Sequence, residues 1–246
     1  NPTPGASNSV FSPNAAPNIR QVSHNPQQPM AGENVLITAK VTDPDGVDAV
    51  TLSYQLVNPG AYINLEDASY DSNWTDLSMV DNGSSGDAIA GDSIFSVTLP
   101  GTLQTHRRLI RYRITVTDIA GASVRTPYAD DESPNFAYFC YNGVPDWNAS
   151  KRPGVAPNVT YPAEALDSIA VYHLITKQSD VVACQWTGPN DGAYRYLGTW
   201  VYDGKVYDHM RYRIRGNAST RQVGRNKWKI NFPNAHPLEA RDNYGE

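Results

Sequence analysis

The sequence predicts a mainly β protein: an immunoglobulin-like β-sandwich followed by part of a smaller α+β unit. Three observations predict this class. Glycine and proline number 18 each and tyrosine 15, whereas charged residues make up only 18%, a composition rich in turn formers and strand formers. Short segments of alternating apolar and polar residues recur between turn signals, with no strong helical pattern between them. The third observation is a change of charge along the chain.

The two parts of the chain differ in charge. Residues 1–141 contain 7 Lys/Arg and 15 Asp/Glu, a net charge of −8, and residues 142–246 contain 13 and 10, a net charge of +3. This split favours two units with different partners. Neither unit is basic enough to indicate duplex nucleic acid as the main ligand. The sequence has no apolar run long enough to span a membrane and no signal peptide, and because it does not begin with Met we interpret it as a piece of a longer protein.

Residues 1–17 are rich in Asn, Pro, Ser and Ala and predict a linker. Residues 18–141 then predict the sandwich, because several short strands follow one another at regular spacing. The strands that we expect most clearly cover residues 34–43, 47–56, 93–101, 109–118, 120–126 and 135–141. The segment YRITVTDIAG in the fourth of them resembles the late strand of fibronectin-type or immunoglobulin-like modules of secreted bacterial proteins.

A long acidic, Gly-rich loop, Asp81–Ser96, interrupts these strands. Its aspartates Asp81, Asp87 and Asp92 offer hard oxygen ligands that suit a structural Ca²⁺ ion. The spacing is not that of an EF-hand, and Asp in a long turn also serves simply to accept backbone hydrogen bonds. The same two interpretations apply to Asp43 and Asp45 in the turn DPDG.

The second unit is separated from the sandwich by a Pro- and Asn-rich stretch, residues 142–162, which predicts a linker. In residues 163–246, the segment Ser168–Ile175 predicts an apolar strand and Ser179 the N-cap of a short helix. Asp203-Gly204 lies between two alternating runs and predicts a tight hairpin turn. The run NKWKINF predicts a further strand.

The chain has two cysteines, Cys140 and Cys184, and their spacing matches no metal site. They either form a disulfide or are two separately buried thiols. We favour two thiols, because free cysteine is among the residue types most often buried.

The sequence RYRI occurs twice, at Arg111–Ile114 and at Arg211–Ile214. Side chains alternate across a strand. In the first copy, Tyr112 and the isoleucines two residues before and after it therefore point to the core. Arg111 and Arg113 point the other way, and we expect them on the solvent-exposed face of a sandwich sheet.

In the second copy the same alternation puts Met210, Tyr212 and Ile214 on one face. The run NKWKINF repeats this polarity. If the two strands pair, five cations share one sheet face: Arg211, Arg213, Arg215, Lys227 and Lys229. Such a face is repulsive unless acidic residues or an anion oppose it, and Arg and Lys both suit phosphate groups. The face is either a phosphate-binding surface or a solvated, salt-bridged side of a sheet.

The segment Tyr207–Phe232 resembles the N-terminal part of the CotH family of spore-coat and secreted kinase-like proteins. Members carry a strand ending in an R-x-R-G-N-S/A-S-like motif, which Arg213–Ser219 matches. A basic strand of the type K-K-S-x-K-x-K-F follows in the family and corresponds to Arg225–Phe232. AVYHLI resembles the family's first strand, and the resemblance covers about the last 80 residues. Arg225-Asn226 replaces the family's Lys-Lys and Lys227 its Ser, so individual lysines align to within one or two residues.

This resemblance implies an atypical kinase-like fold that uses ATP and Mg²⁺ to phosphorylate Ser or Thr of a protein substrate, in a secreted or cell-surface bacterial protein. In kinase folds a Lys on an N-lobe strand holds the nucleotide phosphates, and metal-binding Asp and Asn lie in the C-lobe. The resemblance therefore implies Lys229 as the main phosphate-binding residue, with Arg215 and Lys227 as further candidates. No C-lobe follows Glu246, so residues 163–246 are expected to be an incomplete kinase domain that is inactive by itself.

A second class of function is an extracellular adhesion or carbohydrate-binding sandwich without catalysis. Trp74, Trp186 and Trp200 would stack on a surface glycan if exposed, although buried aromatic residues are the commoner case. A hydrolase fits less well, because no Ser or Cys lies in a recognisable nucleophile turn and the histidines are scattered. These are His24, His106, His173, His209 and His236.

Overall fold

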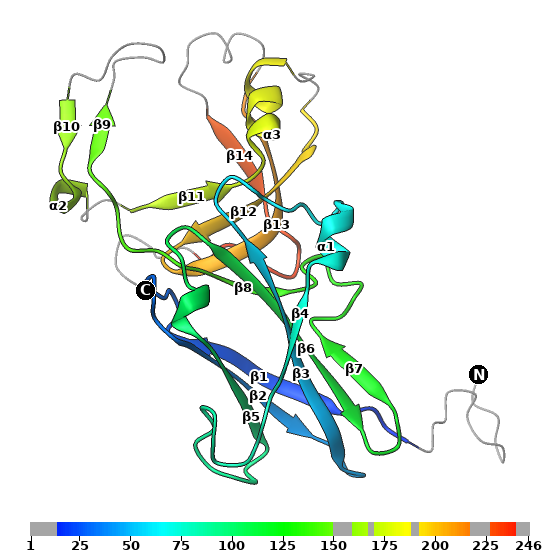
Figure 1. The fold of residues 1–246 in the computed structure, drawn as a ribbon. Coiled ribbons are helices and arrows are strands. Elements are labelled where there is room, and N and C mark those ends of the chain that lie inside the picture. Colours follow the sequence, from blue (N-terminus) through cyan, green and yellow to red (C-terminus); the bar gives the residue numbers. More distant parts are fainter. Residues whose placement is uncertain (1–13, 150–158, 167–169, 188–191, 217–226, 240–246) are drawn as a thin grey trace, which may run out of the picture.

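The computed structural model of the chain describes residues 14–149, 159–166, 170–187, 192–216 and 227–239. The protein is mainly β, as predicted. Two sheets pack as a sandwich, and a separate four-stranded sheet lies at one end of it (Figure 1). All strand pairings among the described residues are antiparallel. In that same part of the chain, no helix is long and apolar enough to cross a membrane.

The first sheet of the sandwich contains three strands in the order β1-β2-β5. These are β1 (Asn18–Asn25), β2 (Val35–Thr42) and β5 (Ile94–Leu99). In β2, every second residue is a buried Val, Ile or Ala, and the residues between them are half-buried. Burial of each Val or Ile side chain contributes roughly 1.5–3 kcal/mol, so this alternation determines which face of the strand points inward.

The second sheet has the order β4-β3-β6-β7, and β8 also pairs with β6. Its strands are β3 (Val47–Val57), β4 (Thr75–Ser78), β6 (Leu109–Asp118), β7 (Ser123–Thr126) and β8 (Phe136–Phe139). The short helices α1 (Ala68–Ser72) and η1 (Gly101–Leu103) lie in its connections. β8 and β7 pair with successive parts of β6. The part that pairs with β8 lies at the end of the sandwich next to the second unit (Figure 1).

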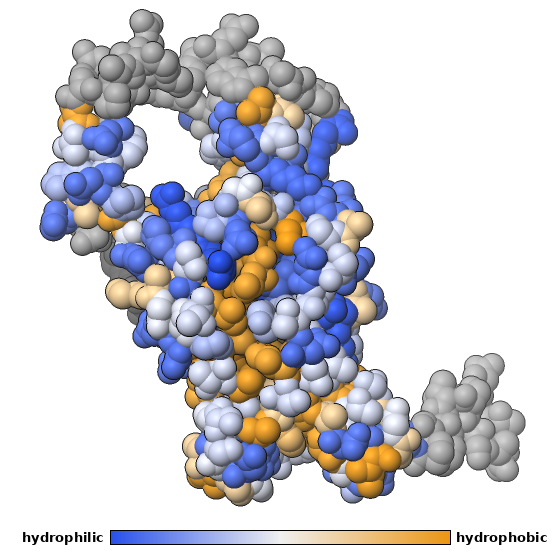
Figure 2. All heavy atoms as spheres, in the orientation of Figure 1, coloured by the Kyte–Doolittle hydropathy of each residue, from blue (hydrophilic) through white to orange (hydrophobic). Residues whose placement is uncertain are grey.

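The two sheets share one core. Ile37 and Leu99 of the first sheet and Leu52, Ile110 and Ile114 of the second are fully buried in it. On the side of the molecule shown in Figure 2, an apolar strip runs along the sandwich between mostly polar residues. In β2 and β6 the core side is the one that the sequence alternation predicts.

The separate sheet has the order β11-β12-β13-β14. Its strands are β11 (Tyr172–Ile175), β12 (Tyr196–Tyr202), β13 (Lys205–Ile214) and β14 (Trp228–Asn231). Asp203 and Gly204 connect β12 to β13 with φ angles of 51° and 73°, as a two-residue hairpin turn with two positive φ angles requires. This confirms the predicted hairpin. Met210, Tyr212 and Ile214 pack with the aromatic and aliphatic side chains of β14 on one face, which is also as predicted.

The helix after β11 differs from the prediction. Helix α3 spans Gln178–Val182, begins after Lys177 as its N-cap, and continues as the π-helical segment η2 (Ala183–Thr187). The prediction that Ser179 is the N-cap is wrong, since the Ser179 hydroxyl lies inside the first turn and donates to Asp180 at 3.3 Å. Lys177 forms an ion pair with Asp67 of the sandwich at 2.6 Å, so the start of the helix contacts the sandwich.

The two cysteines are far apart in the fold. Cys140 is buried in the sandwich core and Cys184 under the face of β13 that carries Met210. Both are free thiols. The interpretation as two separately buried thiols is therefore confirmed, and a disulfide between them is excluded in this structure.

The stretch predicted as a linker between the units contains a small ribbon of two paired strands, β9 (Trp147–Ala149) and β10 (Val159–Tyr161), followed by helix α2 (Ala163–Leu166). The ribbon stands away from the sandwich in Figure 1. The predicted N-terminal linker lies almost wholly outside the described residues.

The separate sheet packs directly on the sandwich. Val57, Leu109 and Phe139 of the sandwich form an apolar cluster with Val201 of β12, and strands β8 and β13 are in contact. Burial of these side chains on both sides holds β13 against the end of β6. This contact positions the candidate site described next.

Candidate functional site

The predicted basic face is present on β13 and β14. Arg213 pairs with Lys229 across the two strands, and Arg211 pairs with Asn231. The backbone N–H of Arg215 donates to the carbonyl of Lys227 at 2.7 Å. These pairings place the five cations on one side of the sheet, in three successive rows. We call Arg211, Arg213, Arg215, Lys227 and Lys229 the basic face.

Most of this basic face has no acidic partner among the described residues. Arg211 donates to the carboxylate of Glu66 at 3.2 Å, in an exposed pair. For the other four cations, the described residues provide no ion pair with a carboxylate. Arg215, Lys227 and Lys229 are exposed and Arg213 is half-buried. A like-charged surface of this kind favours an anionic ligand.

An aromatic ring lies beside the middle row. The guanidinium carbon of Arg213 is 5.3 Å from the ring centroid of Tyr194, and the Nζ of Lys229 is 5.8 Å from it. Both distances fit cation–π attraction. Arg213 also donates to the carbonyl of Ile214 at 3.2 Å. These contacts place Arg213 and Lys229 on either side of one strand pairing and next to the same aromatic ring.

The two site residues predicted beside Lys229 occupy the outer row. Arg215 and Lys227 lie opposite one another at the far ends of β13 and β14. The remaining motif residues, Asn217–Ser219 and Arg225-Asn226, lie outside the described residues. Arg213 was not named as a phosphate-binding residue from the sequence, but its register opposite Lys229 makes it the natural partner of that lysine.

The first RYRI copy contradicts the sequence analysis. Arg111 does not lie on a solvent-exposed face, since its side chain is 0% exposed. Its Nε and Nη2 donate to the two carboxylate oxygens of Asp208 on β13, at 2.6 and 3.1 Å. The guanidinium also donates to Gln55 and to the carbonyl of Ile63. The prediction fails because the outer face of β6 is covered at this end by the second unit.

Asp208 is the centre of this buried cluster. Besides Arg111, it accepts hydrogen bonds from the Thr199 hydroxyl at 2.6 Å, the Asn135 amide at 2.9 Å and the backbone N–H of His209 at 3.0 Å. Burial raises the pKa of the Asp208 carboxyl, but Arg111, together with these hydrogen bonds, outweighs burial and holds that pKa well below its usual range. Both carboxylate oxygens are saturated, so the cluster joins the two units and offers nothing to a ligand.

His209 extends the cluster from the next position of β13. Its Nε2 lies 2.7 Å from the Oδ1 of Asn135, which also accepts from the Tyr70 hydroxyl at 2.7 Å. Burial lowers the pKa of the His209 imidazole to about 4, although Asp208 opposes this. The ring is therefore neutral near pH 7, with its Nε2–H donating to Asn135.

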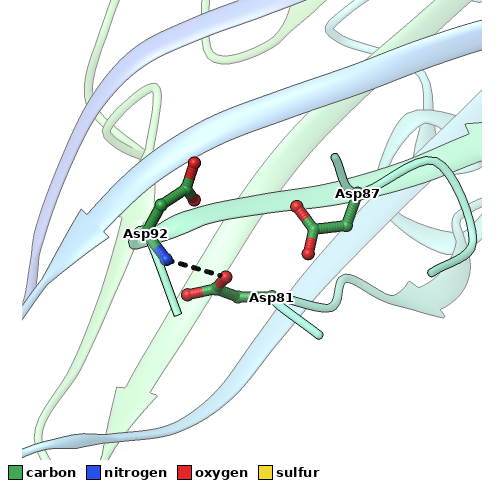
Figure 3. Close-up of side chains that lie close together, drawn as sticks. All are labelled: Asp81, Asp87 and Asp92. Atoms are coloured by element: carbon green, nitrogen blue, oxygen red, sulfur yellow. Dashed lines mark hydrogen bonds between the residues drawn. The ribbon is translucent and has the colours of Figure 1, made fainter. Parts of the chain in front are cut away.

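The acidic loop brings its three aspartates together. One carboxylate oxygen from each of Asp81, Asp87 and Asp92 lies within 4.8 Å of the others (Figure 3). Asp81 accepts backbone hydrogen bonds from residues 91, 92 and 93, and Asp87 accepts one from Gly83 at 2.6 Å. Three carboxylates supply only part of the six to eight oxygens that Ca²⁺ prefers. The Asp81 and Asp87 carboxylates thus accept backbone hydrogen bonds within the loop. Calcium binding there stays a prediction.

The second acidic turn and the tryptophans that were predicted to stack on a glycan do not form a binding site together among the described residues. Asp43 accepts hydrogen bonds from the backbone N–H groups of Asp45 and Gly46, at 2.8 and 3.1 Å, as a turn residue does.

Trp74 is half-buried with the guanidinium carbon of Arg113 at 4.1 Å from its ring centroid. Trp200 lies on the other unit, and the side chain of Trp186 is outside the described residues. Trp74 and Trp200 do not form one platform for a glycan.

Comparison with known proteins adds no relative. The chain matches no protein-family model and no curated protein. The resemblance to the CotH family therefore stays a prediction.

Proposed function

We propose that the basic face binds the phosphate groups of an anionic ligand, and that this ligand is ATP with Mg²⁺, as the resemblance to secreted CotH-type kinases implies. The observation that carries the proposal is the pairing of Arg213 with Lys229 in the middle row. Two cations held side by side, without a carboxylate partner among the described residues, match the geometry of a phosphate group.

Each cation has a separate role in this proposal. Lys229 is a compact charge at the centre of the row, and Arg213 provides a planar donor for two phosphate oxygens. Arg215 and Lys227 extend the same surface by one row and would hold a second phosphate. Phosphoryl transfer also needs metal-binding and base residues. For this chain the proposal covers phosphate binding, and phosphorylation of a protein substrate would need those residues in addition.

The experiment is a calorimetric titration of the chain with ATP and Mg²⁺. We expect saturable binding by the wild type and at least tenfold weaker binding by Lys229→Ala. The matched control is Lys40→Ala, which removes a lysine from strand β2 of the sandwich and should leave the affinity unchanged. Absence of binding to the folded wild type, or an equal loss in the control, would overturn the proposal. A glycan bound without any ATP affinity would instead favour the carbohydrate-binding alternative.

A further inference from the structure

A cavity of about 280 Å³ adjoins the basic face at its sandwich end. Arg211 and Asn231, the first row of the face, form part of its floor together with Leu197 of β12. Leu65 and Glu132, from two loops of the sandwich, form the opposite wall. The cavity therefore exists because the second unit packs on the sandwich, and it is continuous with the proposed phosphate-binding surface.

The register gives the distance between the cavity and the phosphate position. Arg211 and Arg213 are two residues apart on β13, which corresponds to about 7 Å along a strand. A phosphate bound between Arg213 and Lys229 would thus sit one row, or roughly 7 Å, from the cavity floor. A single ring attached directly to that phosphate spans such a distance.

The size of the cavity is sufficient for a single ring. Its volume lies just below the roughly 300–1,000 Å³ of clefts that hold drug-sized ligands.

The side chains around the cavity select the chemistry of that ring. The side-chain amide of Asn231 is exposed. It makes no hydrogen bond to the described part of the chain. Glu132 accepts hydrogen bonds from the backbone and side-chain nitrogens of Asn234, at 2.7 and 3.2 Å. An amide, a carboxylate and the guanidinium of Arg211 can together accept from and donate to several hydroxyl groups. The carboxylate also disfavours a second anionic group at this place.

We propose that this cavity binds the sugar ring of a phosphorylated ligand whose phosphate lies on Arg213 and Lys229. This inference rests on the proposed phosphate-binding function of the basic face and adds the part of the ligand next to the phosphate. A free sugar phosphate and the ribose of a nucleotide share this chemistry. The hydroxyl groups bind Asn231 and Glu132, and the apolar side of the ring contacts Leu65 and Leu197.

The test compares inorganic phosphate with ribose 5-phosphate on the whole chain by calorimetry. We expect ribose 5-phosphate to bind at least tenfold more tightly. Asn231→Ala should remove that advantage and leave the phosphate affinity unchanged, whereas Lys229→Ala should weaken both ligands. The matched control is Asn18→Ala, an exposed strand asparagine of the sandwich, which should change neither.

A second variant tests the space rather than the hydrogen bonds. Leu65→Trp, in a half-buried loop position, fills the cavity and should abolish the advantage of ribose 5-phosphate as Asn231→Ala does. Equal affinity of the wild type for phosphate and ribose 5-phosphate would overturn the inference and leave the proposed function standing. Binding of neither ligand would overturn the proposed function itself. AMP separates the two sources of the ring, since binding as tight as that of ribose 5-phosphate indicates a nucleotide, and weaker binding a free sugar phosphate.

Discussion

Arg111 and Arg211 both begin the sequence RYRI, and the other three residues of the two copies have similar environments. Tyr112 and Tyr212 are buried, as are Ile114 and Ile214. The second arginine of each copy lies beside an aromatic ring. The first arginine is different: Arg111 is fully buried against Asp208, whereas Arg211 forms an exposed pair with Glu66.

This difference shows that strand alternation determines which side chains share a face. Packing between the units determines whether that face is exposed to solvent. Arg111 binds a residue of the strand that carries the second copy, because Asp208 lies on β13 three positions before Arg211. The first copy thus anchors the second. The buried pair holds β13 in place, and the cations further along β13 stay available to a ligand.

The largest effect is expected from removing Asp208. Asp208→Ala leaves the Arg111 guanidinium buried without its carboxylate, and we expect a loss of about 3–5 kcal/mol in the free energy of unfolding. Urea unfolding measures this loss. The control is the double variant Arg111→Met/Asp208→Leu, which removes both charges and should recover most of the stability. A single variant as stable as the wild type would show that the pair is not an anchor.

The next effect concerns the pH dependence of the same junction. The pKa of His209, about 4 in the folded chain, lies below its value of about 6.5 in the unfolded chain. The unfolded chain therefore binds more protons between these pH values, so stability is present at pH 7 and is lost as the pH falls toward 4. We expect His209 to contribute roughly 3 kcal/mol to this loss.

The measurement is the slope of the unfolding free energy between pH 7 and pH 4. His209→Gln should flatten it, whereas His106→Gln, outside the buried cluster, should retain it. Equal slopes in the wild type and His209→Gln would contradict the role of a buried neutral imidazole beside Asp208 and Arg111.

A smaller effect, on ligand affinity, is expected to distinguish the second arginine of one RYRI copy from that of the other. Arg213 pairs with Lys229 on the basic face, and Arg113 lies over Trp74 on the sandwich. We expect Arg213→Ala to weaken binding of ATP and Mg²⁺ about tenfold, or about 1.4 kcal/mol, and Arg113→Ala to leave it unchanged. The two variants are compared in the same calorimetric titration. Equal losses would mean that ligand binding is not confined to the second copy.

Local pattern accounts for the features that the sequence predicts correctly. Alternation in β2, β6 and β13 identifies their core faces, Asp203-Gly204 identifies the hairpin, and the shared polarity of β13 and β14 identifies the face on which the cations lie once the strands pair. The approach of Asp81, Asp87 and Asp92 to one another is likewise confined to one loop.

Contacts between distant segments account for what the sequence did not predict. Arg111 and Asp208 are 97 positions apart, and no periodicity in either strand indicates that they meet. A carboxylate followed by histidine inside the strand VYDHM was the available signal, since such residues are buried only with partners. The cavity beside Arg211 could not be predicted from the sequence either, because its walls come from loops of one unit and its floor from strands of the other.

The most direct test of this comparison is urea unfolding of Arg111→Met beside Arg211→Met, the same substitution at the same place in each RYRI copy. Arg111→Met leaves the Asp208 carboxylate buried and unpaired, and we predict a loss of about 3–5 kcal/mol. Arg211→Met breaks an exposed pair, and we predict a loss below about 1 kcal/mol. Equal losses in the two variants would contradict the division into an anchoring copy and a ligand-facing copy.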